Sequence, residues 1–442
     1  MRALMHSGQL KGHTAVVVGA AVSGRSAARL LAALGATVRL LDRNPEAMDA
    51  KAKDEMAALG VNLHLGPHKS AFFKGADLVA LSPGIPVAKL GQFLAACPQA
   101  QVVGELELAS WFTEAPILAV TGTNGKTTTV SLIGHILGQS GRRVFVGGNI
   151  GTPLSDHVLS GQPCDVAVLE VSSFQLQNVS GFRPKVGVLL NFSDNHLDWH
   201  ADREEYLGAK LNLFARMTAD DLAILPLEMK ESLENRAFTK ARRAYFTATD
   251  RFPENSLPGA HNKANMEAAW LACKAFGVTL DEAGKAVASF KPLAHRLEPV
   301  AEKGGVLFVD DSKATTVEAM RAAILSFDRP VRLLAGGVFK GGDLESLRGL
   351  LAERVAAVGL FGDNREVFEK AWAGTVPMFW EPKLEPAVTR LYGEAAHGDV
   401  VLLSPATASF DLYADYKARG KDFARIVAQL PEDRPGGVRG MQ

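Results

Sequence analysis

The segment PILAVTGTNGKTTTVSLIGHIL constrains the fold more than any other part of this 442-residue sequence. It opens with an apolar run up to Thr121 that is typical of a buried strand, and the residues from Thr127 onward have helical spacing. Between them lies a loop that contains two glycines, Gly122 and Gly125. A strand, a glycine loop and a helix in this order predict an α/β fold with a parallel sheet and an anion site at the start of the helix.

The loop departs from the usual phosphate-binding pattern G-x-x-x-x-G-K-[ST], because Val120 stands where the first glycine is expected. It nevertheless keeps glycines for close backbone approach, a lysine for the β- and γ-phosphates and a threonine hydroxyl for Mg²⁺. A glycine turn that only joins strand to helix is the simpler alternative. The residues of the loop that we predict to bind ATP are Gly122, Thr123, Asn124, Gly125, Lys126, Thr127 and Thr128.

The same alternation of β-branched runs with alanine- and leucine-rich stretches occurs in three blocks, which predict three α/β domains. We expect a Rossmann-like domain over 1–112, a central phosphate-loop domain with a parallel sheet over 113–298, and a second Rossmann-like α/β domain over 299–442. In the first block, Ala21 replaces the middle glycine of a dinucleotide fingerprint. A βαβ unit without a ligand is therefore an equal alternative there.

Charge and composition exclude several classes of partner. Lys plus Arg and Asp plus Glu number 48 each, so no net field attracts nucleic acid or an anionic membrane. No apolar run approaches the ~20 residues of a spanning helix, and the N-terminal residues lack the apolar region of a signal peptide. Cys97, Cys164 and Cys273 have no C-x-x-C spacing and are expected to be buried neutral thiols. The cysteine usage predicts a reducing, cytoplasmic setting, and we expect a monomer.

Polar residues end several predicted strands of the central block and should gather at one edge of its sheet. Glu170 ends the run VAVLE, and its carboxylate is of the type that Mg²⁺ prefers. The motif NHLDWH adds His196, for which a solvated loop is the alternative. Lys210, in YLGAKLNLF, would by itself be interpreted as an ordinary surface charge.

The motifs TGTNGKTT, EVSSFQL, NHLD, YLGAKLNLF, GAHNKANMEAA, HRLE, DDSKAT and LSPATASFD follow one another in an order that resembles the Mur ligase family. This family comprises the ATP-dependent amino-acid ligases of peptidoglycan synthesis, and the short G-T-N-G-K-T loop is its variant of the phosphate loop. The resemblance covers nearly the whole chain. It implies a carbon–nitrogen ligase that adds D-glutamate to UDP-N-acetylmuramoyl-L-alanine through an acyl phosphate and releases ADP and phosphate.

The resemblance also implies a role for each motif residue. Catalysis would depend on Lys126, Glu170, His196 and Lys210. Two Mg²⁺ ions would be held by Thr127, Glu170, His196 and Lys210, the last as a carbamate. Beyond the loop, ATP would meet Asn262, Asn265, Arg296 and Asp311. The UDP-linked substrate would meet Ser23, Asp42, Ser82, Gly84, Asn149 and His196. D-glutamate would meet Lys313, Thr315, Lys340, Ser409 and Tyr416.

Some positions depart from the family pattern. Asn44 stands where an arginine near the uracil is expected, Asn195 stands where an acid is common, and Tyr416 stands where phenylalanine is frequent. Three alternatives stay open: a sibling ligase that adds a different amino acid, a P-loop kinase or NTPase, and a dinucleotide-dependent oxidoreductase. The kinase explains the loop but not the third block, and the oxidoreductase leaves the loop unexplained.

Overall fold

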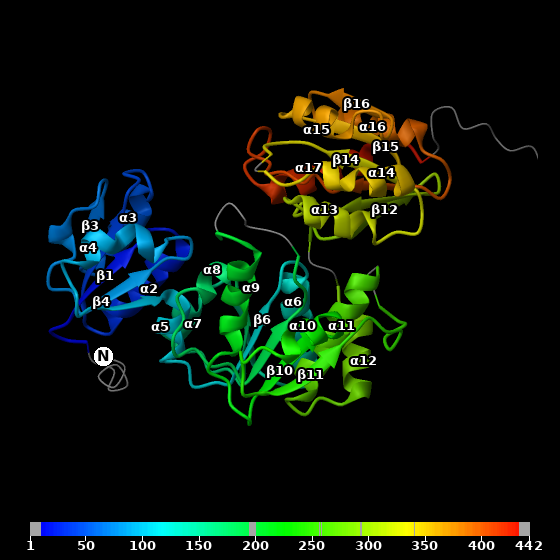
Figure 1. The fold of residues 1–442 in the computed structure, drawn as a ribbon. Helices are drawn as coiled ribbons and strands as arrows, with labels where there is room; N and C mark the ends of the chain where they lie inside the picture. The colour runs from blue at the N-terminus through cyan, green and yellow to red at the C-terminus, as the bar shows by residue number, and fades with distance from the viewer. Residues whose placement is uncertain are drawn as a thin grey trace, which may run out of the picture. The chain divides into compact units, whose positions relative to one another are not determined.

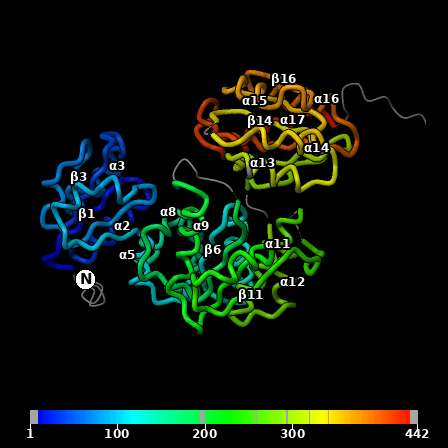
Figure 2. Tube along the Cα trace, in the orientation of Figure 1, coloured from blue at the N-terminus to red at the C-terminus, as the bar shows by residue number. Residues whose placement is uncertain are grey.

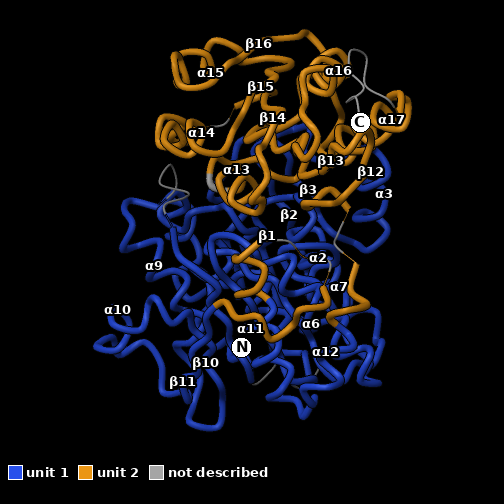
Figure 3. Tube along the Cα trace, turned by 90° about the vertical axis from the view of Figure 1, so that its right-hand side faces the viewer, with its two compact units in different colours: residues 1–247, 266–286 blue, residues 248–265, 287–442 orange. Residues whose placement is uncertain are grey.

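The computed structural model describes residues 10–193, 200–255, 257, 259–291, 294–339 and 341–432, apart from the side chain of Glu318. It contains three sheets in two compact units, which Figure 3 colours separately. Residues 1–247 with 266–286 form the first unit, and 248–265 with 287–442 form the second. Each sheet takes its strands from one continuous stretch of chain (Figures 1 and 2), which agrees with the three predicted blocks.

The first sheet has five parallel strands in the order β3-β2-β1-β4-β5. The predicted strand at its centre and the predicted strand end at Asp42 are both confirmed. The strands are β1 (Thr14–Val18), β2 (Thr37–Asp42), β3 (Asn62–Leu65), β4 (Leu78–Leu81) and β5 (Gln101–Gly104). The helices are α2 (Val22–Ala33), α3 (Ala50–Ala58), η1 (Ser70–Phe72), η2 (Val87–Leu90), α4 (Gly91–Leu94) and α5 (Glu105–Ser110).

The second sheet has six parallel strands in the order β11-β10-β9-β6-β8-β7. Its strands are β6 (Ile117–Thr121), β7 (Val144–Gly148), β8 (Val166–Glu170), β9 (Val186–Leu189), β10 (Leu222–Pro226) and β11 (Arg242–Phe246). The helices that follow them are α6 (Lys126–Gln139), α7 (Leu154–Ser160), α8 (Ser173–Leu176), α9 (Arg203–Leu211), η3 (Asn212–Phe214), η4 (Leu227–Met229), α10 (Lys230–Glu234), α11 (Ala260–Lys274) and α12 (Leu280–Ser289).

The third sheet has the order β12-β13-β17-β14-β15-β16 and is parallel except at one edge, where β12 pairs antiparallel with β13. Gly304 and Gly305 both have positive φ and allow the tight turn between these two strands. The strands are β12 (Glu298–Lys303), β13 (Val306–Asp310), β14 (Val331–Ala335), β15 (Val355–Phe361), β16 (Met378–Glu381) and β17 (Val400–Leu403). The helices are α13 (Val317–Ile324), η5 (Glu345–Leu347), α14 (Arg348–Arg354), α15 (Arg365–Trp372), α16 (Leu384–Glu394) and α17 (Tyr416–Gln429).

The three sheets confirm the predicted α/β fold with parallel strands. In each sheet the loops that follow the carboxyl ends of the parallel strands lie at one edge, and this is the edge where ligands bind in open parallel sheets. Among the described residues, no helix has the length and apolar character needed to cross a membrane. Cys97 and Cys273 are buried as expected, whereas Cys164 is only half-buried and lies 3.3 Å from Nε2 of His157.

A buried carboxylate joins the first sheet to the second within the first unit. Glu107, in α5, accepts hydrogen bonds from the backbone N–H groups of Ser180, Gly181 and Phe182, at 3.1, 2.9 and 2.8 Å. It also accepts a hydrogen bond from Nε1 of Trp111 at 3.0 Å. Because Glu107 is 1% exposed, water does not replace these bonds when the carboxylate is lost.

Replacing Glu107 with alanine is therefore expected to lower the free energy of unfolding of the first unit by about 3 kcal/mol, since several buried donors lose their acceptor at once. Chemical denaturation followed by circular dichroism measures the change. The exposed Glu114, a few residues along the same connection, provides the matched control. Glu114→Ala is expected to change the free energy by less than about 0.5 kcal/mol, and an equal loss in both variants would contradict the role of Glu107.

Candidate active site

The predicted phosphate loop joins β6 to α6 in the second sheet. Gly122 and Gly125 have φ values of 152° and 80°, so both occupy backbone regions that L side chains rarely adopt. A Cβ atom at Gly122 would also lie 3.0 Å from Cβ of Leu190. Helix α6 begins at Lys126, one residue before the predicted start at Thr127. The backbone N–H groups of the first turn therefore face the loop, as an anion site requires.

Asn191, which follows β9, braces this loop. Its Oδ1 accepts hydrogen bonds from the backbone N–H groups of Thr123 and Asn124, at 3.1 and 2.9 Å. Its Nδ2 donates to the backbone carbonyl of Asn124 at 3.1 Å. The sequence predicted that polar residues after the strands of this sheet gather at one edge, but nothing in it connected Asn191 with the loop. The signal was a polar residue that ends the apolar run closing at Leu190.

Two lysines meet at the carbonyl of Gly122. Nζ of Lys126 lies 3.0 Å from this oxygen and 2.8 Å from the carbonyl oxygen of Thr123, and Nζ of Lys210 donates to the Gly122 oxygen at 2.9 Å. Lys210 is 1% exposed, and its Nζ lies 4.4 Å from the centre of the Tyr206 ring. The interpretation of Lys210 as a surface charge is therefore wrong. Burial, and secondarily the charge of Lys126, holds the pKa of Lys210 well below its ordinary value.

Glu170 and Thr127 supply the oxygen atoms that Mg²⁺ would need. Oγ1 of Thr127 donates to Oε2 of Glu170 at 2.6 Å, and Nδ2 of Asn149 donates to Oε1 of Glu170 at 2.9 Å. Thr127 and Glu170 are 8% and 3% exposed, so both oxygens lie in a sheltered place beside the loop. A hydroxyl, a carboxylate and phosphate oxygens fit the preference of Mg²⁺. His196 lies outside the described residues.

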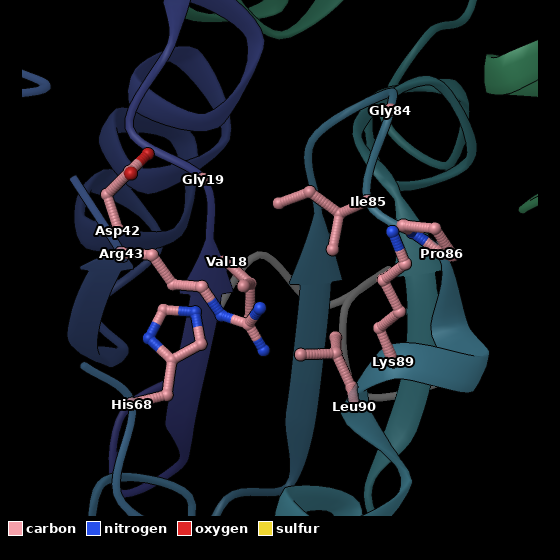
Figure 4. Close-up of a pocket in the computed structure, with 10 residues that line it drawn as sticks. All are labelled: Val18, Gly19, Asp42, Arg43, His68, Gly84, Ile85, Pro86, Lys89 and Leu90. Atoms are coloured by element: carbon pink, nitrogen blue, oxygen red, sulfur yellow. The ribbon is translucent and has the colours of Figure 1, made fainter. Parts of the chain in front are cut away.

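A cavity of about 210 Å³ lies at the carboxyl edge of the first sheet (Figure 4). Of the residues predicted for the UDP-linked substrate, Asp42 and Gly84 line it. Oδ2 of Asp42 accepts the backbone N–H of Ala20 at 2.8 Å and so holds the glycine turn. Oγ of Ser82 donates to the Gly19 carbonyl at 3.0 Å and braces the same turn, while Ser82 and Ser23 are not among the residues that line the cavity.

Three cationic or titratable residues of this cavity had no predicted role: Arg43, His68 and Lys89. Figure 4 shows Arg43 and His68 on one wall and Lys89 on the other. Nδ1 of His68 is buried without a hydrogen-bond partner. An arginine is thus present beside the acid that ends β2, although at position 43 and not at position 44, where we expected it.

The second unit gathers several predicted ATP-binding residues. Asp311 follows β13. Its Oδ2 accepts a hydrogen bond from Oγ of Ser404 at 3.0 Å, and its Oδ1 lies 3.3 Å from the backbone nitrogen of Leu297. Burial raises the pKa of Asp311 to about 7, although the Ser404 bond and the charge of Arg296 oppose that shift. Asn262 and Asn265, both 4% exposed, are joined by a hydrogen bond of 3.1 Å between Nδ2 of Asn265 and Oδ1 of Asn262.

Four of the five residues predicted for D-glutamate, Lys313, Thr315, Ser409 and Tyr416, lie at the carboxyl edge of the third sheet. Nζ of Lys313 donates to the hydroxyl of Tyr416 at 3.1 Å and lies 4.2 Å from the centre of its ring. Ser409 is buried and Thr315 is half-buried, and both are in loops that follow strands of this edge. Lys340 lies outside the described residues.

Arg419, in α17, binds two of the loops at this edge and had no predicted role. It is fully buried, and its Nη2 donates to the carbonyls of Ser312 and Thr407 at 2.8 and 3.1 Å. Burial lowers its pKa to about 10. An arginine within a helical pattern is usually exposed, so the sequence contained no signal for this contact.

One group of three side chains among the described residues has the spacing of a metal site: His295, Glu298 and Asp310, whose ligand atoms lie within 4.8 Å of one another. Oδ2 of Asp310 is 2.7 Å from Nδ1 of His295, and Oε2 of Glu298 accepts the backbone N–H of His295 at 2.7 Å. These atoms therefore already bind each other or the backbone, which favours a structural clamp over a metal site.

Three family models match the chain. They are described as "Mur ligase MurD-like, N-terminal domain" over residues 13–104, "Mur ligase middle domain" over 120–254 and "Mur ligase, glutamate ligase domain" over 295–407. The chain is 54% identical to a UDP-N-acetylmuramoylalanine--D-glutamate ligase of Oleidesulfovibrio alaskensis, with 96% of this chain and 95% of that protein covered. It is 40% identical to the protein of that name from Syntrophus aciditrophicus, with 95% and 98% covered.

Solved structures show the same fold at lower identity. A MurF from Acinetobacter baumannii has a TM-score of 0.59 and 18% identity, with 89% of this chain and 91% of that chain covered. A MurF ligase from Thermotoga maritima, solved in complex with ADP, has a TM-score of 0.58 and 17% identity, with 88% and 94% covered.

Proposed function

We propose which residues carry out each step of the reaction in this chain, which belongs to the Mur ligase family. The enzyme adds D-glutamate to UDP-N-acetylmuramoyl-L-alanine in peptidoglycan synthesis and consumes ATP. Family membership and the relatives at 54% identity leave the kinase, the oxidoreductase and the sibling ligase without support. The observation that carries the proposal is the cluster of Lys126, Thr127, Glu170 and Lys210 around one phosphate loop.

The phosphate loop activates the substrate carboxylate. A carboxylate is a poor acyl donor until one of its oxygens carries a phosphate, so the first step is attack of this carboxylate on the γ-phosphate of ATP, giving an acyl phosphate and ADP. Lys126 and the N–H groups of the first turn of α6 hold the β- and γ-phosphates and stabilise the charge that spreads over them. When bound, Mg²⁺ neutralises phosphate charge, and Thr127 and Glu170 would hold one such ion.

Lys210 contributes an oxygen ligand once it is carbamylated. A neutral amine is required for attack on CO₂, and the burial that lowers the pKa of Lys210 favours this neutral form. The carbamate would replace a cation by an anion close to a second Mg²⁺ ion. His196 would complete the ligands of that ion, as the family resemblance implies.

The outer domains select the two substrates. Asp42, Gly84 and the cations of the first cavity would receive the UDP group, together with Ser23 and Ser82 of the same domain. Asn149 and His196 would contact the same substrate from the central domain, as the family resemblance implies. Lys313, Thr315, Lys340, Ser409 and Tyr416 would receive D-glutamate, whose two carboxylates require cations and hydroxyl donors. The amine of D-glutamate then displaces phosphate from the acyl phosphate and forms the amide. We place the enzyme in the cytoplasm as a monomer, a setting that suits its free thiols.

Product formation tests the proposal. The protein is incubated with ATP, Mg²⁺ and UDP-N-acetylmuramoyl-L-alanine together with D-glutamate, L-glutamate, meso-diaminopimelate or L-lysine, and the amide is identified by mass spectrometry. We expect product and stoichiometric phosphate release with D-glutamate alone, because the site must orient one stereoisomer for attack. Equal product with L-glutamate, or phosphate release without an amino acid, would contradict the proposal.

A further inference from the structure

The turn that leads into β12 is strained on both sides of Arg296. His295 has a φ of 65° and Leu297 a φ of 45°, and both are L residues in the left-handed region. Such conformations are costly for residues with a side chain and persist only where the surroundings hold them. Arg296 itself lies between the two strained residues and is half-buried.

Several contacts hold this turn. Nδ1 of His295 lies 2.7 Å from Oδ2 of Asp310, and the backbone N–H of His295 donates to Oε2 of Glu298 at 2.7 Å. The carbonyl of His295 accepts the backbone N–H of Lys313 at 3.1 Å. Oδ1 of Asp311 lies 3.3 Å from the backbone nitrogen of Leu297. The turn is thus attached to the end of β13 at both of its strained residues.

The His295–Asp310 pair is buried against the backbone of α17. The exposed fractions of His295 and Asp310 are 9% and 1%. A Cβ atom at Gly420 would overlap Nδ1 of His295 and Oδ2 of Asp310, so the helix can approach this closely only with glycine at that position. The other oxygen of Asp310 accepts the backbone N–H of Ser312 at 2.8 Å. All of these contacts lie within the second unit.

We propose that His295 and Asp310 are positioning residues, which act on ATP through Arg296 and Asp311 and do not touch the nucleotide. The pair forces the strained turn that presents the Arg296 guanidinium, and the same turn brings the Leu297 N–H to Asp311. The inference rests on the proposed role of Arg296 in binding ATP. It explains why a histidine, a glutamate and an aspartate with the spacing of a metal site are all occupied by hydrogen bonds within the protein.

A double-mutant cycle tests the inference in the full-length enzyme. The variants are His295→Asn, Arg296→Ala and the double variant, and the KM values for ATP and for the UDP-linked substrate are measured. Asn tolerates the left-handed backbone, so His295→Asn removes the contact with Asp310 while keeping the turn accessible. We expect each single variant to raise the KM for ATP about tenfold, the double variant to add little to Arg296→Ala, and the KM for the UDP-linked substrate to stay unchanged.

The possible failures are distinguishable. If the two single effects multiply in the double variant, His295 acts independently of Arg296, and the positioning inference is overturned while the proposed function stands. If Arg296→Ala leaves the KM for ATP unchanged, the proposed role of Arg296 fails, and the inference fails with it.

Three further variants, Gly420→Ala, Asp310→Asn and Asp399→Asn, separate positioning from loss of stability. Gly420→Ala pushes a methyl group into the pair without removing either side chain, and we expect it to raise the KM for ATP as His295→Asn does. Asp399→Asn is the matched control for Asp310→Asn, because Asp399 is also a buried carboxylate of this unit and accepts Nε of Arg332 at 2.6 Å. Both Asn variants should lower the melting temperature, but only Asp310→Asn should raise the KM for ATP. An equal rise with Asp399→Asn would overturn the inference.

Discussion

Replacing Lys210 with alanine is expected to lower kcat by about 10³-fold, and short carboxylic acids such as acetate or propionate are expected to restore part of the activity. The physical reason is that the alanine variant leaves a space at the buried end of α9 where the carbamate would otherwise place its oxygens. A small carboxylate can enter that space and supply the same charge. The measurement is initial rate against carboxylate concentration, with ATP, Mg²⁺ and both substrates saturating.

Lys185 is the matched control for this experiment. Lys185 directly precedes β9 of the same sheet, but its side chain is 49% exposed. Its Nζ forms an ion pair with Asp221 and donates a hydrogen bond to the carbonyl of Asp220. Lys185→Ala should retain wild-type rates and show no response to carboxylic acids. A Lys210→Ala enzyme with wild-type rates, or one whose lost activity no carboxylate restores, would argue against the carbamate.

Glu170→Gln is expected to lower kcat by about 10²- to 10³-fold and to raise the concentration of Mg²⁺ needed for half-maximal activity. Gln has nearly the same shape, so the bonds to Thr127 and Asn149 can be replaced, but the negative charge at the phosphate loop is lost. The measurement is the dependence of kcat on Mg²⁺ at fixed ATP. It separates loss of the metal-binding charge from a general loss of structure.

Asp221→Asn provides the corresponding control. Asp221 is a buried carboxylate beside the same sheet. Its Oδ2 accepts hydrogen bonds from Nε of Arg183 at 2.7 Å and from the backbone N–H of Thr218 at 2.8 Å. We expect this change to reduce stability and to leave the Mg²⁺ dependence as it is in the wild type. If both variants shift the Mg²⁺ dependence equally, Glu170 has no special role with the ion.

Local patterns were sufficient to predict much of the fold. The run from Thr14 to Val18 and the strand end at Asp42 could be read from the apolar alternation and its polar stop. The glycines of the loop indicated a tight turn, because glycine readily adopts positive φ values, and Gly122 and Gly125 do have positive φ in the structure. The antiparallel β12 was not predicted, since its pairing depends on a turn at Gly304 and Gly305 and not on any property of the strand itself.

Sequence patterns suggested a site residue only where that residue carries its chemistry in its own motif. Glu170 and Lys126 stand at the end of a strand and in a glycine loop, and the roles that we propose for them rest on those positions. Asn191, Arg43 and Arg419 do not stand in such motifs. Asn191 and Arg419 contact distant segments, at Asn124 and Ser312, and Arg43 only lines a cavity to which distant residues contribute. Single-sequence patterns contain no information about such pairs.

The sequence by itself determined that this protein has three α/β blocks and a short phosphate loop. Strand periods, helix periods and glycine turns are properties of neighbouring residues, so they can be recognised without the tertiary structure. The sequence also supplied Lys210, but not its surroundings. Only the tertiary structure decided that Lys210 is buried beside Lys126, that Glu107 joins two sheets, and that His295 and Asp310 hold a strained turn. Burial, pKa and hydrogen bonding depend on which distant segments meet. That meeting is settled by packing and not by local pattern.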